Sequence, residues 1–280
     1  MEYENVLYEP QDNIARITLN RPEKLNALSA NLQRDLGSAL EEADNDWDIR
    51  CIIIRGAGRA FCAGADLTPS AERNSNVERR NNIRWDIENA KRGGKRWGNL
   101  WDISKPVIAQ VHGYCLAAGT SLATHCDIII AAENAVIGFP PVRNLGTPSA
   151  FMWPYLMPIQ WVKWVMFTGN NFSGKQAAEM GWALKSVPAD QLEDTVDDLA
   201  STISRVSYEM LAASKSICNK AIELMGKDLL QTFAQEVDAV SHQSTAVKEF
   251  QQISQEEGLR AALEWMNAPF QDYGKGKQQS

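Results

Sequence analysis

The sequence predicts an α/β protein whose last third is mainly helical. Over the first two thirds of the chain, short apolar segments of strand length alternate with stretches that have helical spacing. From about Ser173 onward, apolar residues recur mainly at helical spacing, with the Pro188 region and Gly226 as interruptions. The chain has 280 residues, of which 44% are hydrophobic, and this is enough to bury a sizeable core.

The first predicted helix follows two predicted strands. Five segments are predicted as strands: Val6–Tyr8, Ala15–Leu19, Cys51–Arg55, Val107–Val111 and Asp127–Ala131. Ser29 is a suitable N-cap after the second of them, because its hydroxyl can accept a hydrogen bond from an N–H of the first helical turn. Apolar side chains then recur at helical spacing and form one stripe: Leu32, Leu36, Ala39, Leu40 and Ala43. This stripe predicts an amphipathic helix.

Charge and composition argue against several classes of partner. The formal net charge of −7 disfavours nucleic-acid binding, since such binding relies on basic patches that neutralise phosphates. The apolar runs are too short to cross a membrane, and the acidic N-terminus does not have the pattern of a signal peptide. We therefore expect no nucleic-acid partner, no membrane association and a cytoplasmic location. The five cysteines, whose number is odd and whose spacing is not that of a metal site, are expected to be free thiols.

Two turns of small residues are the strongest candidates for a site. One lies in AFCAGADL, from Ala60 to Leu67, and the other lies in GYCLAAGTSLA, which begins at Gly113 and opens a short helix. Free N–H groups and the positive end of a helix dipole at such a turn attract negative charge. Donors from the two turns could therefore converge on one carbonyl oxygen. The alternative is that both are tight packing turns.

Five segments, in order along the chain, resemble the crotonase superfamily, which is the enoyl-CoA hydratase/isomerase family. They are NRPEKLNALS, AFCAGADL, KPVIAQVHGYCLAAGTSLA with CDIIIAAENAVIGFP, FTGNNFSGKQAAEMG, and EEGLRAALEW with APF. The resemblance implies a crotonase-like spiral of β-β-α units at residues 1–190, which holds an acyl-CoA site. It also implies a C-terminal helical trimerisation region at residues 191–280, and hence a homotrimer or a dimer of trimers.

The resemblance also assigns the residues of the acyl-CoA site. In this family two backbone N–H groups hold the thioester carbonyl, and the matching positions here are Ala65 and Ala118. The CoA arm is expected along Lys24, Leu25, Ala63, Asp66 and Leu67. Asp66 could instead cap a following helix. Coenzyme A enters as part of the substrate, and we expect no permanently bound cofactor and no metal, because the Gly-rich turns lack the dinucleotide fingerprint and no metal ligand set is visible.

Hydratases of this family use two glutamates to activate water, and this chain resembles a divergent member that lacks both. The first position holds Ser121 and the second holds Pro141. A serine hydroxyl cannot act as a general base at neutral pH, and proline has no side-chain proton. Ser121 stays a candidate hydrogen-bond donor to substrate or water. His125 is expected to be a core histidine that bonds a backbone carbonyl, rather than a base for Ser121.

The predicted acyl pocket contains Phe139, Pro141, Arg143 and Trp85. Its aromatic content predicts a bulky or cyclic acyl group, although the same side chains could pack the core or a trimer interface. Arg143 is a candidate partner for an acidic group of the substrate. Asp86 and Glu88 are candidate acids in place of the glutamates, with Arg84 as a carboxylate partner. The alternative for each of these charged residues is a solvated surface position.

Two classes of function follow. The first is an enzyme of the enoyl-CoA hydratase/isomerase family, a lyase or isomerase, which stabilises a thioester enolate or oxyanion with non-standard acid/base residues. The same intermediate would serve hydrolysis or C–C cleavage of a β-keto acyl-CoA, or decarboxylation, and fold alone does not choose among them. The second class is a catalytically silent homologue that binds an acyl-CoA. The two donor turns favour the enzyme, and the loss of both glutamates favours the silent homologue.

Overall fold

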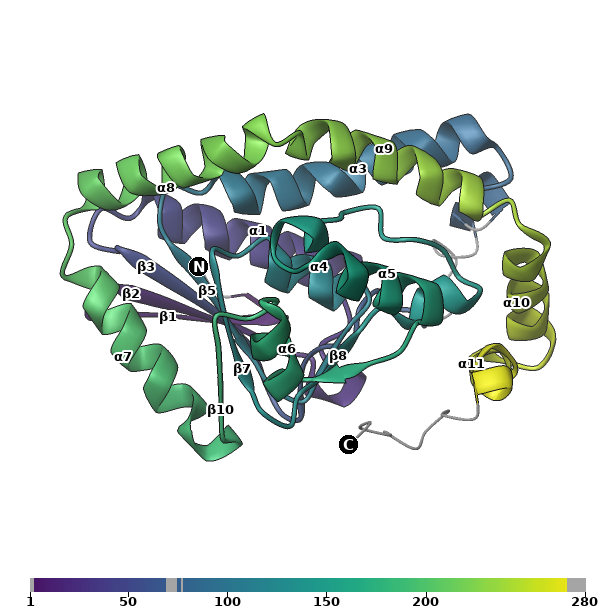
Figure 1. The fold of residues 1–280 in the computed structure, drawn as a ribbon, viewed down its shortest axis with the longest axis horizontal. Coiled ribbons are helices and arrows are strands. Elements are labelled where there is room, and N and C mark those ends of the chain that lie inside the picture. Colours follow the sequence, from purple (N-terminus) through teal and green to yellow (C-terminus); the bar gives the residue numbers. More distant parts are fainter. Residues whose placement is uncertain (1–2, 69–74, 77, 271–280) are drawn as a thin grey trace.

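Two sheets of different size form the centre of the fold (Figure 1). The computed structural model describes residues 3–68, 75–76 and 78–270. In this part of the chain the larger sheet has six strands, in the order β1 (Val6–Gln11), β2 (Ile14–Leu19), β3 (Cys51–Gly56), β5 (Val107–Val111), β7 (Ile128–Ala132) and β10 (Lys185–Val187). Among the same residues the smaller sheet has four, in the order β4 (Ala60–Cys62), β6 (Tyr114–Leu116), β8 (Val136–Gly138) and β9 (Phe172–Ser173). All five segments that the sequence predicts as strands lie in the larger sheet.

The strand pairing produces a spiral of β-β-α units. β1 pairs antiparallel with β2, and from β2 onward the larger sheet is parallel. In the successive pairs β3–β4, β5–β6 and β7–β8, the first strand joins the larger sheet and the second joins the smaller sheet. β4, β6 and β8 are also parallel neighbours, so their carboxyl ends meet at one edge of the smaller sheet. This arrangement brings the segments that follow β4 and β6 side by side.

The first helix, α1 (Ala30–Asn45), forms as the sequence predicts. The Ser29 hydroxyl accepts a hydrogen bond from Leu32 N at 3.2 Å, which satisfies one free donor of the first turn. The buried side chains of α1 are the five residues of the predicted apolar stripe. They pack on β1 and β2. Full burial of one leucine such as Leu32 contributes about 2 kcal/mol.

The remaining helices lie between the strands and in the C-terminal region. Over residues 83–270 they are α3 (Ile83–Asp102), α4 (Ala118–Thr124), α5 (Ile159–Thr168), α6 (Gly174–Met180), α7 (Leu192–Ser204), α8 (Tyr208–Leu224), α9 (Lys227–Ser241), α10 (Thr245–Glu256) and α11 (Leu259–Asn267). Figure 1 shows α8 and α9 following one another along the top of the view, and α9 packs against α3. Gly226 separates α8 from α9 with φ +91°. α7 packs on β3, β5 and β7, so the start of the helical region shares the core of the larger sheet.

The cysteines are free thiols, as predicted. Four of them are buried: Cys51, Cys62, Cys115 and Cys126. Burial raises the pKa of Cys51 and of Cys62 to about 12, so both thiols stay protonated and inert at neutral pH. In the described residues, no helix is both long enough and apolar enough to span a bilayer.

Candidate functional site

The two predicted turns interlock at the carboxyl ends of β4 and β6. Gly64 lies in the first turn with φ +103°, and a Cβ at this position would lie 2.8 Å from Ala117 Cβ and 3.3 Å from Ala118 N. Gly119 lies in the second turn, where a Cβ would lie only 2.2 Å from the carbonyl oxygen of Cys62. Each turn therefore needs a glycine so that the other can approach closely.

Ala117 holds a strained conformation at the start of α4. Its φ of 51° with ψ of −124° is a region that residues with a Cβ rarely adopt. The Ala117 N–H donates to Gly138 O at 3.0 Å, and the Thr120 hydroxyl donates to Ala117 O at 2.6 Å. Such strain costs about 1–3 kcal/mol, and it persists only where the surrounding structure enforces it. Here it sets the direction of the first turn of α4.

Two backbone donors are unpaired where the turns meet. Among the described residues, neither Ala65 N nor Ala118 N donates to another group. Ala118 is the first residue of α4, so its N–H has no acceptor inside the helix. Ala65 is exposed and Ala118 is half-buried, so a ligand can reach both. Two free donors on adjacent, rigid turns are suited to hold a carbonyl oxygen and the negative charge that develops on it.

The segment that contains Lys24 and Leu25 lies directly beside the first turn. Ala63 N donates to Leu25 O at 3.0 Å, and Leu28 N donates to Gly64 O at 2.8 Å. These bonds bring together the residues that were predicted to contact CoA: Lys24, Leu25, Ala63, Asp66 and Leu67. Lys24 is exposed, so its ammonium group is available to a phosphate.

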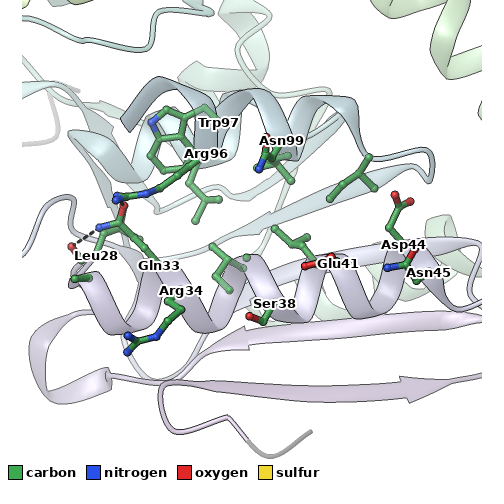
Figure 2. A pocket seen from close by; sticks show the side chains of 17 residues that line it. Leu28, Gln33, Arg34, Ser38, Glu41, Asp44, Asn45, Arg96, Trp97 and Asn99 are labelled. Atoms are coloured by element: carbon green, nitrogen blue, oxygen red, sulfur yellow. Dashed lines mark hydrogen bonds between the residues drawn. The ribbon is translucent and has the colours of Figure 1, made fainter. Parts of the chain in front are cut away.

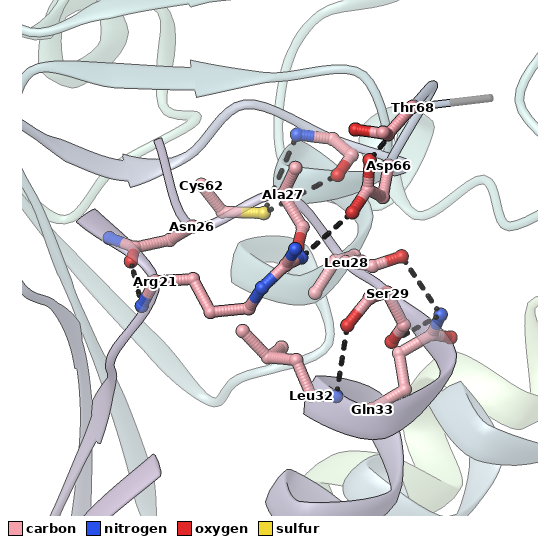
Figure 3. A network of polar contacts seen from close by, with 11 residues as sticks. Arg21, Asn26, Ala27, Leu28, Ser29, Leu32, Gln33, Cys62, Asp66 and Thr68 are labelled. Atoms are coloured by element: carbon pink, nitrogen blue, oxygen red, sulfur yellow. Dashed lines mark hydrogen bonds and ion pairs between the residues drawn. The ribbon is translucent and has the colours of Figure 1, made fainter. Parts of the chain in front are cut away.

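Asp66 is engaged by Arg21, as Figure 3 shows. Arg21 Nη1 donates to Asp66 Oδ2 at 2.9 Å and also to Ala27 O at 2.8 Å. The other carboxylate oxygen accepts from Thr68 N at 2.9 Å. Partial burial by itself would raise the pKa of Asp66, but the bonds from Thr68 and Arg21 outweigh it and lower the pKa below its ordinary value. The carboxylate thus fixes the backbone where the chain leaves the first donor turn.

Ser121 lies on α4 and His125 lies at its C-terminal end, and their side chains form no hydrogen bond with each other. The Ser121 hydroxyl is buried and donates to Ala150 O at 3.4 Å. His125 Nδ1 lies 2.7 Å from the Ser121 carbonyl oxygen, so the prediction of a core histidine that bonds a backbone carbonyl is confirmed. Burial lowers the pKa of His125 to about 4, against the smaller opposing effect of this hydrogen bond. A neutral, buried imidazole donates this bond at neutral pH.

The residues predicted for the acyl pocket have different surroundings. Phe139 is buried in the main core, and Pro141 supplies only its carbonyl, which accepts from the N–H groups of residues 144, 145 and 146. Arg143 is buried, donates to Thr168 O, Asn170 Oδ1 and Asn267 Oδ1, and stacks on the Phe270 ring. These contacts make it a link between the loop after β8, α5 and α11. Trp85, on α3, has the guanidinium groups of Arg79 and Arg92 each 5.9 Å from the centre of its ring.

The two candidate acids on α3 differ in burial. Asp86 is only 1% exposed, and its Oδ2 lies 2.6 Å from Nδ1 of His242, the residue that directly follows α9. The prediction that Arg84 is its partner was wrong, because Arg84 is exposed and Arg80 is the arginine near Asp86. Glu88 lies at the surface and is 3.9 Å from Lys91.

A groove of about 610 Å³ runs between α1 and α3, and Figure 2 shows its side chains. It begins at Leu28, which bonds the first donor turn. Arg34 and Arg96 lie toward one end of it and Glu41 and Asp44 lie toward the other (Figure 2), so the two pairs of opposite charges balance and do not favour a polyanion such as CoA. In the described residues, no group of three or more His, Cys, Asp and Glu side chains is arranged to hold a metal ion.

The model of the enoyl-CoA hydratase/isomerase family matches residues 9–274 of this chain. The chain belongs to this family. A probable enoyl-CoA hydratase of Mycobacterium bovis is 33% identical over 238 residues, which cover 80% of this chain and 84% of that protein. A hydroxycinnamoyl-CoA hydratase-lyase of Pseudomonas fluorescens is 33% identical over 227 residues, which cover 79% and 80% respectively. The crystal structure of an enoyl-CoA hydratase from Mycobacterium smegmatis matches with a TM-score of 0.92 at 32% identity, covering 99% of this chain and 98% of that one.

These comparisons confirm the crotonase-like fold and the family that the five sequence segments indicated. Ser121 and Pro141 stand at the two positions that the sequence resemblance aligns with the glutamates of hydratases in this family. Sequence reasoning missed Arg21, because 45 residues separate it from Asp66 and no local pattern connects them. It also missed the strain at Ala117, since an alanine beside another alanine gives no signal of a positive φ.

Proposed function

We propose that this chain is an acyl-CoA-processing enzyme that stabilises a thioester enolate or oxyanion between Ala65 N and Ala118 N. The observation that supports this most directly is the pair of unpaired donors on two interlocked turns. One donor of this kind is worth about 3 kcal/mol of transition-state stabilisation. The adjacent CoA arm would follow Lys24, Leu25, Ala63, Asp66 and Leu67, and coenzyme A would enter and leave with the acyl group.

The acid/base chemistry of this proposal is non-standard. The Ser121 hydroxyl donates to a backbone carbonyl, and Pro141 offers no ionisable group. A hydratase mechanism that relies on two carboxylates therefore has no support at these positions. Double-bond isomerisation and lyase reactions would use the same two donors, and each would need a proton acceptor other than Ser121 and Pro141.

The proposed substrate class is a CoA ester with a bulky or cyclic acyl group. The relative from Pseudomonas fluorescens is a hydroxycinnamoyl-CoA hydratase-lyase, whose name implies an aromatic acyl group. Half-buried aromatic side chains also lie near Ser121. Trp97 contacts the His125 ring at 5.9 Å, and Phe151 follows Ala150, whose carbonyl accepts from Ser121. Flat rings of this kind pack well on a planar acyl group.

The proposed assembly is a homotrimer or a dimer of trimers in the cytoplasm. Its support is an apolar face on α8 and α9 that the single chain leaves exposed. It consists of Met210, Ile217, Leu224, Met225, Leu229, Phe233 and Val240. The two helices that carry this face run along the top of the view in Figure 1, and a second copy would cover the face.

The test combines turnover with a matched pair of ligands. Purified protein is incubated with crotonyl-, cinnamoyl-, cyclic enoyl- and β-keto acyl-CoAs, and products are identified by mass spectrometry. Calorimetry then compares an acyl-CoA thioester with the thioether of equal length, which lacks the carbonyl oxygen. Two hydrogen bonds of about 1 kcal/mol each predict binding of the thioester about thirtyfold tighter. Equal affinity for both ligands, or retained turnover after Ala118→Trp, would contradict the proposed donor site.

One alternative is favoured by specific residues. Ser121 and Pro141 fit a catalytically silent homologue that binds an acyl-CoA without turnover. In that case the thioester preference is retained while no member of the panel is converted. Conversion of a β-keto acyl-CoA instead identifies hydrolysis, C–C cleavage or decarboxylation as the reaction. Rapid hydration of crotonyl-CoA would show that the argument from Ser121 and Pro141 is wrong.

A further inference from the structure

A group of ionisable side chains, most of them buried, lies between α3 and the end of α9. Asp86 Oδ2 lies 2.6 Å from His242 Nδ1, and Asp238 Oδ1 lies 3.5 Å from Nε2 of the same ring. Arg80 Nε lies 3.6 Å from the other oxygen of Asp86. We call Arg80, Asp86, Asp238 and His242 the buried charge cluster. Two basic side chains face two carboxylates in it, and Asp86 and Asp238 are only 1% and 8% exposed.

The buried charge cluster holds the loop of residues 144–151. Asp238 Oδ1 accepts from Thr147 N at 2.9 Å. Gly146 packs on the histidine ring so closely that a Cβ there would lie 2.9 Å from His242 Nε2. About two turns earlier on α9, Gln231 bonds Phe151 twice, with Phe151 N donating to Oε1 at 2.7 Å and Nε2 donating to Phe151 O at 3.0 Å. α9 therefore anchors the loop at two points.

This loop joins the buried charge cluster to both positions that lack a glutamate. Near its start, Gly146 N donates to Pro141 O at 3.1 Å. Near its end, Ala150 O accepts from the Ser121 hydroxyl at 3.4 Å. A bond of this length is near the upper limit for a hydrogen bond, so a small displacement of Ala150 by the loop would break it. A displaced loop would leave the hydroxyl free to rotate.

We propose that the buried charge cluster positions the loop of residues 144–151 and, through Ala150, orients the Ser121 hydroxyl in the acyl-CoA site. This inference rests on the proposed function of that site. Asp86, Asp238 and His242 act through the loop, so they are positioning residues. A buried polar group that loses a hydrogen-bond partner is destabilising, and this favours a single arrangement of the cluster and of the loop bonded to it.

Two pairs of variants test the proposal in the full-length protein. Asp238→Ala removes the acceptor for Thr147 N, whereas Asp238→Asn keeps an acceptor oxygen at the same place. Gln231→Met removes both bonds to Phe151 at a half-buried position, where a change is compatible with folding. Glu236→Ala is the control, because Glu236 is an exposed carboxylate on the same helix.

Two measurements are made on each variant. Hydrogen exchange of the ligand-free protein should speed up by about tenfold or more at Thr147 N in Asp238→Ala and at Phe151 N in Gln231→Met. With the acyl-CoA that the wild type converts, kcat should fall by about tenfold or more while KM changes by less than about threefold. Asp238→Asn should recover most of both losses, and Glu236→Ala should match the wild type.

The outcomes separate this inference from the proposed function. Unchanged exchange in both Asp238→Ala and Gln231→Met would show that α9 does not hold the loop. Faster exchange with unchanged kcat would show that the loop does not serve the site. Either result refutes the inference and leaves the acyl-CoA function standing. A wild type that neither binds nor converts any CoA ester of the panel refutes the proposed function, and the inference with it.

Discussion

The buried imidazole of His125 should make the protein sensitive to mild acid. The side chain is 4% exposed, and burial lowers its pKa from an ordinary value of 6.5 to about 4. The folded-state pKa lies below the unfolded-state value, so the unfolded chain binds the proton more readily. Stability is therefore complete above about pH 6.5 and is lost as the pH falls toward about 4. At about 1.4 kcal/mol per unit of pKa, the total loss is about 3 kcal/mol.

The perturbation that isolates this effect is His125→Asn. Asparagine places an amide N–H close to where Nδ1 donates to Ser121 O, and it does not titrate. The smaller side chain lowers the stability of the variant at every pH, because it leaves space beside Trp97. The pH dependence is therefore the informative quantity, and between pH 7 and pH 5 the wild type should lose about 2 kcal/mol more than the variant.

Urea unfolding at pH 7, 6 and 5, followed by tryptophan fluorescence, measures this difference. The contributions of other titrating groups, such as the buried Asp238, are common to both proteins and cancel in the comparison. Parallel stability curves for the wild type and His125→Asn would refute the reasoning. That result would mean that the imidazole of His125 has the same pKa in the folded and the unfolded protein.

Three further predictions concern backbone strain, a partly buried ion pair and assembly. Ala117→Gly relieves the positive φ and should raise the free energy of unfolding by about 1 kcal/mol in urea titrations, and a loss would disprove the strain. Lys215→Met leaves Asp127, whose side chain is 19% exposed, without the cation 2.8 Å away but with its bond from Val107 N, and it should cost about 1–3 kcal/mol by the same assay, more than a double variant with Asp127→Leu. Sedimentation should show three or six chains per particle, and Leu229→Glu with Phe233→Glu should release monomers; a monomeric wild type would contradict the proposed assembly.

Much of the fold could be predicted because its signals are local. The apolar stripe of α1 and its Ser29 cap are set within a few residues, and the structure confirms both. The predicted strands are buried runs of β-branched residues, such as Ile52 to Ile54, which favour a central strand wherever they occur. The smaller sheet was harder to predict, because β4, β6, β8 and β9 have only two or three residues each. Segments so short have no periodicity to detect.

The candidate site could be predicted only in part. The two donor turns carry a strong motif, and their proximity follows from the parallel pairing of β4 with β6. His125 was placed correctly because helical spacing alone puts it one turn beyond Ser121. The contact between Asp86 and His242 joins residues 156 positions apart, and no local sequence pattern near either residue predicts it. Such pairs are decided by how α9 packs on α3, which is a property of the whole fold.

Backbone strain gives independent evidence for where the site lies. In the described residues, five non-glycine residues have a positive φ: Asp12, Asn13, Leu25, Asn26 and Ala117. Asp12 and Asn13 form the turn between β1 and β2, where such residues tolerate this conformation. The other three border the donor turns, and leucine and alanine have no polar side chain to compensate. Strain of about 1–3 kcal/mol per residue is retained where geometry serves a purpose. Leu25, whose carbonyl accepts from Ala63 N, and Ala117, which begins α4, together fix the turns that present Ala65 N and Ala118 N.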